Sequence, residues 1–332
     1  SVTSRDAAGN VSGTSEMINV KTLSGVTDLY ISAKSKFWKN GNSTSLEVLS
    51  GFQNFGGNIF VAENNVYSSG FITKGNVDDY RRIASYWKNG ILKTLEPLNS
   101  TELSSAEDIA VNGNDVYVVG SVTRYIPYSY YKCYWKNGSK VILPGSTWNG
   151  RYSDPRISKM KIDNDDVYIA SSIYENDYKP VYWKNGTLYQ LPEPTTFNFS
   201  DITSMDVENG NVYIGGGGLK FFTDKRMGFY WKNNEIHEFA DCEGIMCMDV
   251  VNDDVYVAGY NNAGKLAYWK NNVMTEIPFG RQVQSIKVID NDVYLLVSYN
   301  SEYEQIQKVF KNGQEISSFN QENLGNLFLT TY

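Results

Sequence analysis

Histidine, cysteine and proline are scarce in this chain of 332 residues, which has one His, three Cys and eight Pro. A single His excludes metal sites built on histidine pairs, and a histidine-based catalytic site would have to use His237. Three cysteines, an odd number, exclude a disulfide scaffold. The few prolines stand beside 28 glycines, a usage that fits a chain with many tight turns.

The rare residues have simple structural interpretations. Cys133 occupies a repeat position that holds Ser85 and Val181 in other repeats, so we expect a small buried residue there. Cys242 and Cys247 could bridge a loop in an oxidising compartment, although two free thiols are the preferred interpretation. His237 lies in NNEIHEFAD, where we expect an exposed position on an edge strand.

Excess positive charge and long apolar runs are also missing. Lys and Arg total 30 against 37 Asp and Glu, for a net charge of −7, whereas proteins that bind nucleic acid or anionic membranes are normally basic. No run approaches the roughly 18 apolar residues of a membrane-spanning helix. We therefore predict no nucleic-acid partner and no membrane insertion.

Three short signatures recur seven times each along the chain. The first is an aromatic-Trp-Lys-Asn segment, in which the key ring is Trp38, Trp87, Trp135, Trp183, Trp231, Trp269 or Phe310. The second is an Asp/Asn-Val-Tyr segment, with Leu in place of Val in the first copy, and is seen as DVYVVG at 115–120. The third is a mostly apolar stretch, found at 58–61, 108–111, 159–162, 204–207, 247–250, 285–288 and 326–329. Internal repeats of this kind decide a fold.

Together the signatures define a unit of four strands. VNGNDVYVVG (111–120) is its first hairpin and VYWKNGTLYQL (181–191) its second. Asn-Gly between β-rich runs favours a type I′ turn, and Val, Ile, Tyr and Trp favour strands. Neither face of DVYVVG is charged, so the sheet must be covered on both sides.

Radial stacking covers both faces of every sheet, and this predicts a seven-bladed β-propeller. The first unit opens at DLYISA (28–33) without a first strand, while NLFLTTY (326–332) is a first strand with nothing after it. We predict that the C-terminal strand completes the N-terminal sheet and removes two open edges. The predicted fold is all-β, with four-stranded antiparallel blades and a split closing blade, over residues 23–332.

The plan resembles that of WD-repeat and tachylectin-like propellers, with a Trp near the end of the third strand, but the Gly-His and Trp-Asp pairs of WD repeats are missing. The DVYVAG…YWKN unit (254–271) is more closely similar to propeller repeats in secreted proteins of Bacteroidota-type bacteria. The resemblance covers residues 24–332. It implies a propeller fold and a secreted or cell-surface location, and it implies no activity.

Residues 1–22 do not fit the repeat. They resemble the last two strands of a fibronectin type III domain, on Val2, Arg5, Asp6, Ala8, Gly9, Asn10, Ser12, Ile18, Val20 and Thr22. Arg5 departs from the small residue usual at its position. Because two strands make no sandwich core, the resemblance implies an N-terminal β-sandwich remnant, with a spacer role, in a longer multidomain chain. A hairpin packed on the propeller is the alternative.

Motifs for catalysis, phosphate binding or metal binding are weak or missing. GxSxG does not occur, and the glycines at 215–218 lack a following Lys-Ser/Thr, so we expect them to end a strand and permit close packing. Asp/Asn clusters at 163–166, 252–254 and 290–292 look like fragments of calcium loops. All three occupy the first hairpin turn, where turn chemistry explains them. We predict no catalytic residue, no metal and no cofactor.

Aromatic residues gather in loops that strand alternation places on one face of the ring. This face carries the loops between second and third strands and the connections between units, and such faces commonly bind ligands. Exposed aromatic rings and Arg fit recognition of a glycan or a protein, whereas rings that only cap the blades are the alternative. The candidate binding residues are Trp148, Tyr152, Tyr125, Tyr128, Tyr80, Phe199, Phe222 and Arg226.

The sequence therefore predicts a non-enzymatic, secreted or cell-surface recognition module that is monomeric within a longer chain. One alternative is a propeller glycoside hydrolase or lyase, which would need paired carboxylates in the central channel. Glu107 and Asp201 precede the expected first strands, but no pair stands out. A further alternative is a structural module of a large adhesin or secretion-system substrate.

Overall fold

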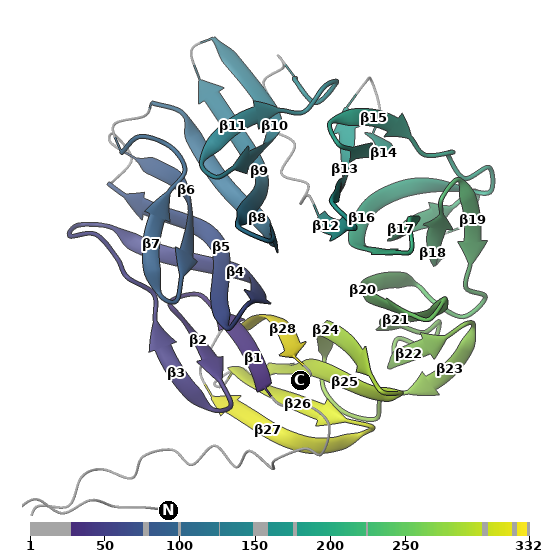
Figure 1. The fold of residues 1–332 in the computed structure, drawn as a ribbon. Helices are drawn as coiled ribbons and strands as arrows, with labels where there is room; N and C mark the ends of the chain where they lie inside the picture. The colour runs from purple at the N-terminus through teal and green to yellow at the C-terminus, as the bar shows by residue number, and fades with distance from the viewer. Residues whose placement is uncertain are drawn as a thin grey trace, which may run out of the picture.

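A computed structural model of the chain describes residues 28–75, 80–98, 101–125, 127–148, 159–174, 178–223, 225–300, 305–320 and 324–330. Every regular element in these residues is a β-strand, and the strands form seven four-stranded antiparallel sheets arranged radially around a channel (Figure 1). The predicted seven-bladed propeller is confirmed. The predicted fibronectin-type remnant, residues 1–22, lies outside the described residues.

Each blade runs from an inner strand at the channel to an outer strand at the rim (Figure 1). The inner strands are β4 (Gln53–Ala62), β8 (Leu103–Asn112), β12 (Lys159–Asp163), β16 (Phe197–Glu208), β20 (Gly244–Val251), β24 (Gln282–Ile289) and β28 (Leu324–Thr330). The second strands are β1 (Asp28–Ala33), β5 (Asn65–Lys74), β9 (Asp115–Tyr125), β13 (Asp166–Tyr174), β17 (Asn211–Lys220), β21 (Asp254–Tyr260) and β25 (Asp292–Asn300).

The two remaining strands of each blade complete the sheet toward the rim. The third strands are β2 (Lys36–Lys39), β6 (Arg81–Lys88), β10 (Tyr128–Lys136), β14 (Tyr178–Lys184), β18 (Arg226–Lys232), β22 (Leu266–Lys270) and β26 (Gln305–Lys311). The outer strands are β3 (Asn42–Ser45), β7 (Ile91–Thr94), β11 (Ser139–Ile142), β15 (Thr187–Gln190), β19 (Glu235–Glu238), β23 (Val273–Glu276) and β27 (Gln314–Asn320).

The two ends of the ring meet in one split blade, as the sequence predicts. In this closing blade β28 is the inner strand and pairs antiparallel with β1, so yellow β28 lies beside purple β1 in Figure 1. The register sets Leu29 opposite Leu329 and Ile31 opposite Leu327. These four side chains are buried, so apolar contact as well as backbone pairing holds the ring shut.

The repeated Trp-Lys-Asn segment forms a hydrogen-bonded clasp between the second and third strands. Asn185 has φ 51°, accepts from Val167 N at 2.9 Å and donates to Asp166 Oδ1 at 2.7 Å. Lys184 Nζ lies 2.6 Å from Asp166 Oδ2 and 5.1 Å from the centre of the Tyr168 ring. The Asn-to-backbone bond recurs in all seven blades, at Asn40, Asn89, Asn137, Asn185, Asn233, Asn271 and Asn312. The clasp explains why the first two signatures recur together.

The repeated Trp residues lie in the apolar layers between blades. All six are at most 5% exposed: Trp38, Trp87, Trp135, Trp183, Trp231 and Trp269. Trp183 Nε1 donates to Pro144 O, in the connection that leaves the preceding blade, at 2.9 Å. The structural role predicted for these Trp residues is confirmed, as is the burial of Cys133.

Bulges in the inner strands bring their backbones close to the second strands. Register shifts occur between Ala106 and Asp108 in β8 and between Ile202 and Ser204 in β16. A Cβ on Gly216, which faces the second of these bulges, would lie 2.4 Å from the Asp201 carbonyl oxygen. Close packing explains the glycine run, as predicted, but the run lies inside β17 and does not end it. A bulge turns the residues after it, and here those residues face the channel.

Candidate functional site

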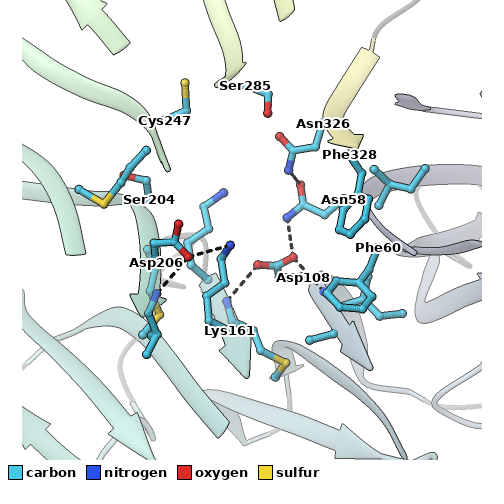
Figure 2. Close-up of a pocket in the computed structure, with 18 of the residues that line it drawn as sticks. Asn58, Phe60, Asp108, Lys161, Ser204, Asp206, Cys247, Ser285, Asn326 and Phe328 are labelled. Atoms are coloured by element: carbon cyan, nitrogen blue, oxygen red, sulfur yellow. Dashed lines mark hydrogen bonds and ion pairs between the residues drawn. The ribbon is translucent and has the colours of Figure 1, made fainter. Parts of the chain in front are cut away.

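The inner strands surround a cavity of about 670 Å³ in the central channel (Figure 2). In the third signature the second side chain is buried in every blade: Ile59, Ile109, Met160, Met205, Met248, Ile286 and Leu327. Strand alternation turns the first and third side chains toward the channel. The first positions hold Asn58, Asp108, Lys159, Ser204, Cys247, Ser285 and Asn326. The third positions hold Phe60, Ala110, Lys161, Asp206, Asp249, Lys287 and Phe328.

Two lysine–aspartate pairs lie along one side of this channel. Lys161 Nζ is 3.1 Å from Asp206 Oδ1 (Figure 2), and Asp206 Oδ2 accepts from Val250 N of the next blade at 2.9 Å. Lys287 pairs with Asp249, whose other oxygen accepts a backbone N–H of β24. Asp206 therefore joins a lysine of the preceding blade to the inner strand of the following blade, whereas both contacts of Asp249 are made with β24 of the following blade.

The charges of the two pairs act on one another. Burial favours a raised pKa for Asp206, but the positive charges of Lys161 and Lys287 hold that pKa below its usual range. Burial raises the pKa of Asp249. The negative charge of Asp206 raises it further, and the positive charge of Lys287 opposes the rise. The pKa of Lys287 rises because the two carboxylates outweigh its burial. All four groups are therefore held by partners across the inner strands.

A chain of amide and carboxylate groups crosses the opposite side of the channel (Figure 2). Asn326 donates to Asn58 Oδ1, and Asn58 Nδ2 donates to Asp108 Oδ1 at 3.0 Å. Asp108 Oδ2 accepts from Met160 N at 2.9 Å. The chain thus links β28, β4, β8 and β12. Polar side chains at the channel join neighbouring blades here as well.

A second cavity, of about 530 Å³, lies on the loop-rich face, which carries the loops between second and third strands and the connections between blades. Its lining includes Tyr260, Lys265, Glu276, Phe279 and Arg281. Lys265 Nζ lies 3.0 Å from Glu276 Oε1, and the Tyr260 hydroxyl donates to the Arg281 carbonyl. We call this cavity the Tyr260–Arg281 groove. It offers aromatic rings, a carboxylate and an arginine in one place.

Several predicted binding residues are well exposed on the same face. Tyr80 is 48% exposed and Tyr125 57%, and Phe222 projects fully into solvent. The Tyr125 and Tyr128 rings lie 6.0 Å apart, edge to face. Arg226 is also exposed. Tyr125 and Tyr128 belong to one blade, Phe222 and Arg226 to a second and Tyr80 to a third, so the structure spreads these residues over three blades.

Two other predicted residues pack against the blades. Trp148 is half-buried and shares two backbone hydrogen bonds with Tyr130, of 2.7 and 2.8 Å, while its ring lies 4.7 Å from that of Tyr174 in the next blade. Phe199 is half-buried, with its ring 5.8 Å from Trp231. Tyr152 lies outside the described residues. The capping interpretation therefore describes Trp148 and Phe199 well.

Sequence reasoning missed the channel residues. Glu107 and Asp201 do not precede the first strands, as we expected, but lie within β8 and β16. The channel carboxylates are instead Asp108 and Asp206, with Asp249 beside them. The available signal was the alternation inside the third signature, where six of the seven first positions and four of the seven third positions hold polar residues. Its apolar second and fourth positions made the whole stretch look like core.

The turn residues, the cysteines and the histidine singled out in the sequence have structural contacts. In the predicted calcium-like turns, Asn164 and Asp165 have φ of 50° and 75°, which confirms the turn interpretation. Cys242 and Cys247 are free thiols, and burial raises the pKa of each to about 12. His237 lies on outer strand β19 and stacks on Tyr230 at 4.8 Å. Across the described ranges, no group of three or more His, Cys, Asp or Glu is placed to hold a metal ion.

No membrane-spanning helix occurs in the part of the chain that the structure describes.

Several solved structures are similar to this chain. An oligogalacturonate lyase from Vibrio parahaemolyticus is 8% identical, with a TM-score of 0.50, over 92% of this chain and 96% of its own. TolB from Acinetobacter baumannii is 7% identical, with a TM-score of 0.46, over 79% and 65%. An acylaminoacyl peptidase from Pyrococcus horikoshii is 13% identical, with a TM-score of 0.38, over 79% and 52%.

The likeness to the lyase, with a TM-score of 0.50, supports the fold alone. The chain spans about half the length of the peptidase and less than two thirds of TolB, whereas it matches the lyase over nearly its whole length. No family model matches the chain, and no curated protein matches it in sequence. The lyase is an enzyme with a similar fold, and at 8% identity its activity does not pass to this chain.

Proposed function

We propose that this propeller is a non-enzymatic recognition module that binds a glycan or a protein through its loop-rich face. The proposal includes a secreted or cell-surface location and a monomeric propeller within a longer chain. The observation that carries it is the Tyr260–Arg281 groove, together with the exposed rings of Tyr80, Tyr125 and Phe222 on the same face.

Physical chemistry supports a binding role for this face. A flat aromatic ring offers contact area to a sugar or a peptide and has few rotatable bonds to immobilise, and arginine adds charge-assisted hydrogen bonds. Tyr125 exposes more than half of its surface although it stands on a regular strand. The blades behind these side chains are packed and clasped, and a rigid support limits the entropy lost on binding.

The competing proposal is a propeller glycoside hydrolase or lyase. Such an enzyme needs a carboxylate that can donate or accept a proton at the reacting bond. Asp206 and Asp249 stand in neighbouring blades at the channel, but each is held by a lysine and a backbone amide. Asp108 likewise accepts from Asn58 and from Met160 N. These contacts favour a structural role for the carboxylates and therefore favour binding over catalysis.

A glycan-array screen and a protein pull-down with the full chain test the proposal. Once a ligand is found, at least one of the variants Tyr125→Ala and Arg281→Ala should weaken its binding by about 10-fold or more. Tyr189→Ala is the matched control, because Tyr189 is 42% exposed but lies on outer strand β15. Its binding should stay within about 2-fold of the wild type.

Two results would contradict the proposal. One is that neither screen finds a ligand. The other is that a ligand is found but binds both loop-face variants as tightly as it binds the control. Incubation with polysaccharides separates the enzyme proposal, because shortened or unsaturated products would establish catalysis. A chain that neither binds nor cleaves would favour the structural module of an adhesin or secretion-system substrate.

A further inference from the structure

Lys159 stands apart among the lysines of the central channel. It lines the cavity of about 670 Å³ and is half-buried on β12. Lys161 and Lys287 each pair with an aspartate. Lys159 forms no ion pair and no hydrogen bond with any residue that the structure describes. An ammonium that is partly withdrawn from water without a counter-ion raises the local potential and favours an anion.

None of the described groups around Lys159 pairs with its ammonium. Lys161 lies two residues further along β12, so alternation puts both ammonium groups on the same face of the strand. The Asp108 oxygens already accept from Asn58 and from Met160 N. The charge of Lys159 is felt at the Cys247 thiol, but burial raises the pKa of that thiol to about 12, so it stays neutral at physiological pH.

Neutral polar groups face the same cavity from the opposite blades. Ser285 of β24 points its hydroxyl into the channel, and Asn326 of β28 lies beside it (Figure 2). Asn326 uses its amide nitrogen on Asn58, while its Oδ1 makes no hydrogen bond within the described residues. The Ser285 hydroxyl and Asn326 Oδ1 lie across the channel from Lys159, where they can form hydrogen bonds with the hydroxyl groups of a ligand.

We propose that the central channel is a second binding site, separate from the loop-rich face, for a small anion that carries hydroxyl groups. Lys159 would hold the carboxylate or phosphate, and Ser285 with Asn326 would hold the hydroxyls. The cavity has room for a molecule of monosaccharide size. The ligand class is thus a sugar acid or a sugar phosphate, two sources of the same hydroxylated-anion chemistry.

Calorimetric titration of the full chain tests this site with glucuronate, glucose 6-phosphate and glucose. We expect one or both anions to bind, and glucose to bind at least 10-fold more weakly. Lys159→Gln should weaken anion binding by about 10- to 100-fold, whereas Lys159→Arg should retain it. Lys93→Gln is the matched control, because Lys93 is exposed on outer strand β7 and loses the same charge.

The two anions distinguish the source of the charge. Binding of glucuronate alone identifies a sugar acid, and binding of glucose 6-phosphate alone identifies a sugar phosphate. Ser285→Ala should weaken the binding of the hydroxylated anion by a few-fold and leave the binding of inorganic phosphate unchanged. Because the loop-rich face lies outside this cavity, Tyr125→Ala should leave anion binding unchanged, so this site and the proposed function can fail separately.

A labelling experiment on the unmodified chain needs no variant. The bound anion should protect Lys159, but not Lys93, from a small acetylating reagent, as read by mass spectrometry. The proposal is overturned if neither anion binds up to about 10 mM or if glucose binds as tightly as the anions. It is also overturned if folded Lys159→Gln binds like the wild type, or if Lys159 acetylates at the same rate with and without the anion.

Discussion

The Asn clasp is the feature of the repeat whose energetic contribution can be worked out most directly. Replacing Asn185 by Ala removes the bond that its Oδ1 accepts from Val167 N, of 2.9 Å, and the bond that its Nδ2 donates to Asp166, of 2.7 Å. It also leaves a side chain with a Cβ but no polar group at φ 51°. We therefore predict that Asn185→Ala destabilises the propeller through both effects.

The size of the effect follows from these two terms. Each lost hydrogen bond costs about 0.5–1.5 kcal/mol, and the left-handed conformation costs Ala about 1 kcal/mol. Water can reach this exposed turn, so the lower half of the range applies, about 2–3 kcal/mol in all. With an unfolding entropy of about 2.1 cal/mol/K per residue over about 300 residues, the Tm should fall by about 3–5 °C.

Thermal unfolding followed by circular dichroism measures this shift. Asn185→Gly is the matched variant, because Gly loses the same two hydrogen bonds but adopts the positive φ without strain. We expect it to lower the Tm less than Asn185→Ala does. The reasoning is refuted if Asn185→Ala changes the Tm by less than about 1 °C, or if Asn185→Gly is the less stable of the two.

Three further predictions concern acid, ring closure and the thiols. Hydrogen bonds from Lys184 and Asn185 lower the pKa of Asp166, so its contribution to stability is full above the ordinary value of 3.8 and is lost as the pH falls below it. Asp166→Asn should therefore reduce the loss of Tm between pH 5 and pH 3. Leu327→Ala at the closing strand should cost about 2–5 kcal/mol, measured by urea unfolding, while exposed Ile91→Ala costs under about 0.5 kcal/mol. Cys242 is buried, and burial raises its pKa to about 12, so it should react with iodoacetamide at pH 8 only after unfolding. Rapid reaction of Cys242 in the native chain would contradict its burial.

Local patterns were enough to predict the fold. The Asn-Gly turns between β-rich runs depend on backbone sterics within four residues, so the residues reveal them directly, as at Asn185. Seven copies of one unit then leave few architectures that cover both faces of every sheet. Even the pairing of β28 with β1 could be predicted. The first repeat unit lacks its inner strand, and the last strand of the chain has the sequence pattern of an inner strand.

The candidate sites could be predicted only in part. The loop-rich face follows from strand alternation, and Tyr80 and Tyr125 are exposed there. The Tyr260–Arg281 groove could not be predicted, because its lining comes from two connections of ordinary composition. Trp148 stood out in the sequence as the Trp outside the repeat, but its ring packs against Tyr174 of the next blade. Loop composition does not determine which neighbour a ring meets.

The sequence by itself determined the number of blades, their strands and turns, and the way the ring closes, because each depends on contacts within one repeat or on a count of repeats. Only the tertiary structure decided what lies at the centre. Lys159 and Ser285 are 126 residues apart in sequence, and the ring brings them to one cavity. A channel lysine forms an ion pair, as Lys161 does, only where another blade places an aspartate within reach. The distances between side chains of different blades are set by ring closure and not by local conformational preference.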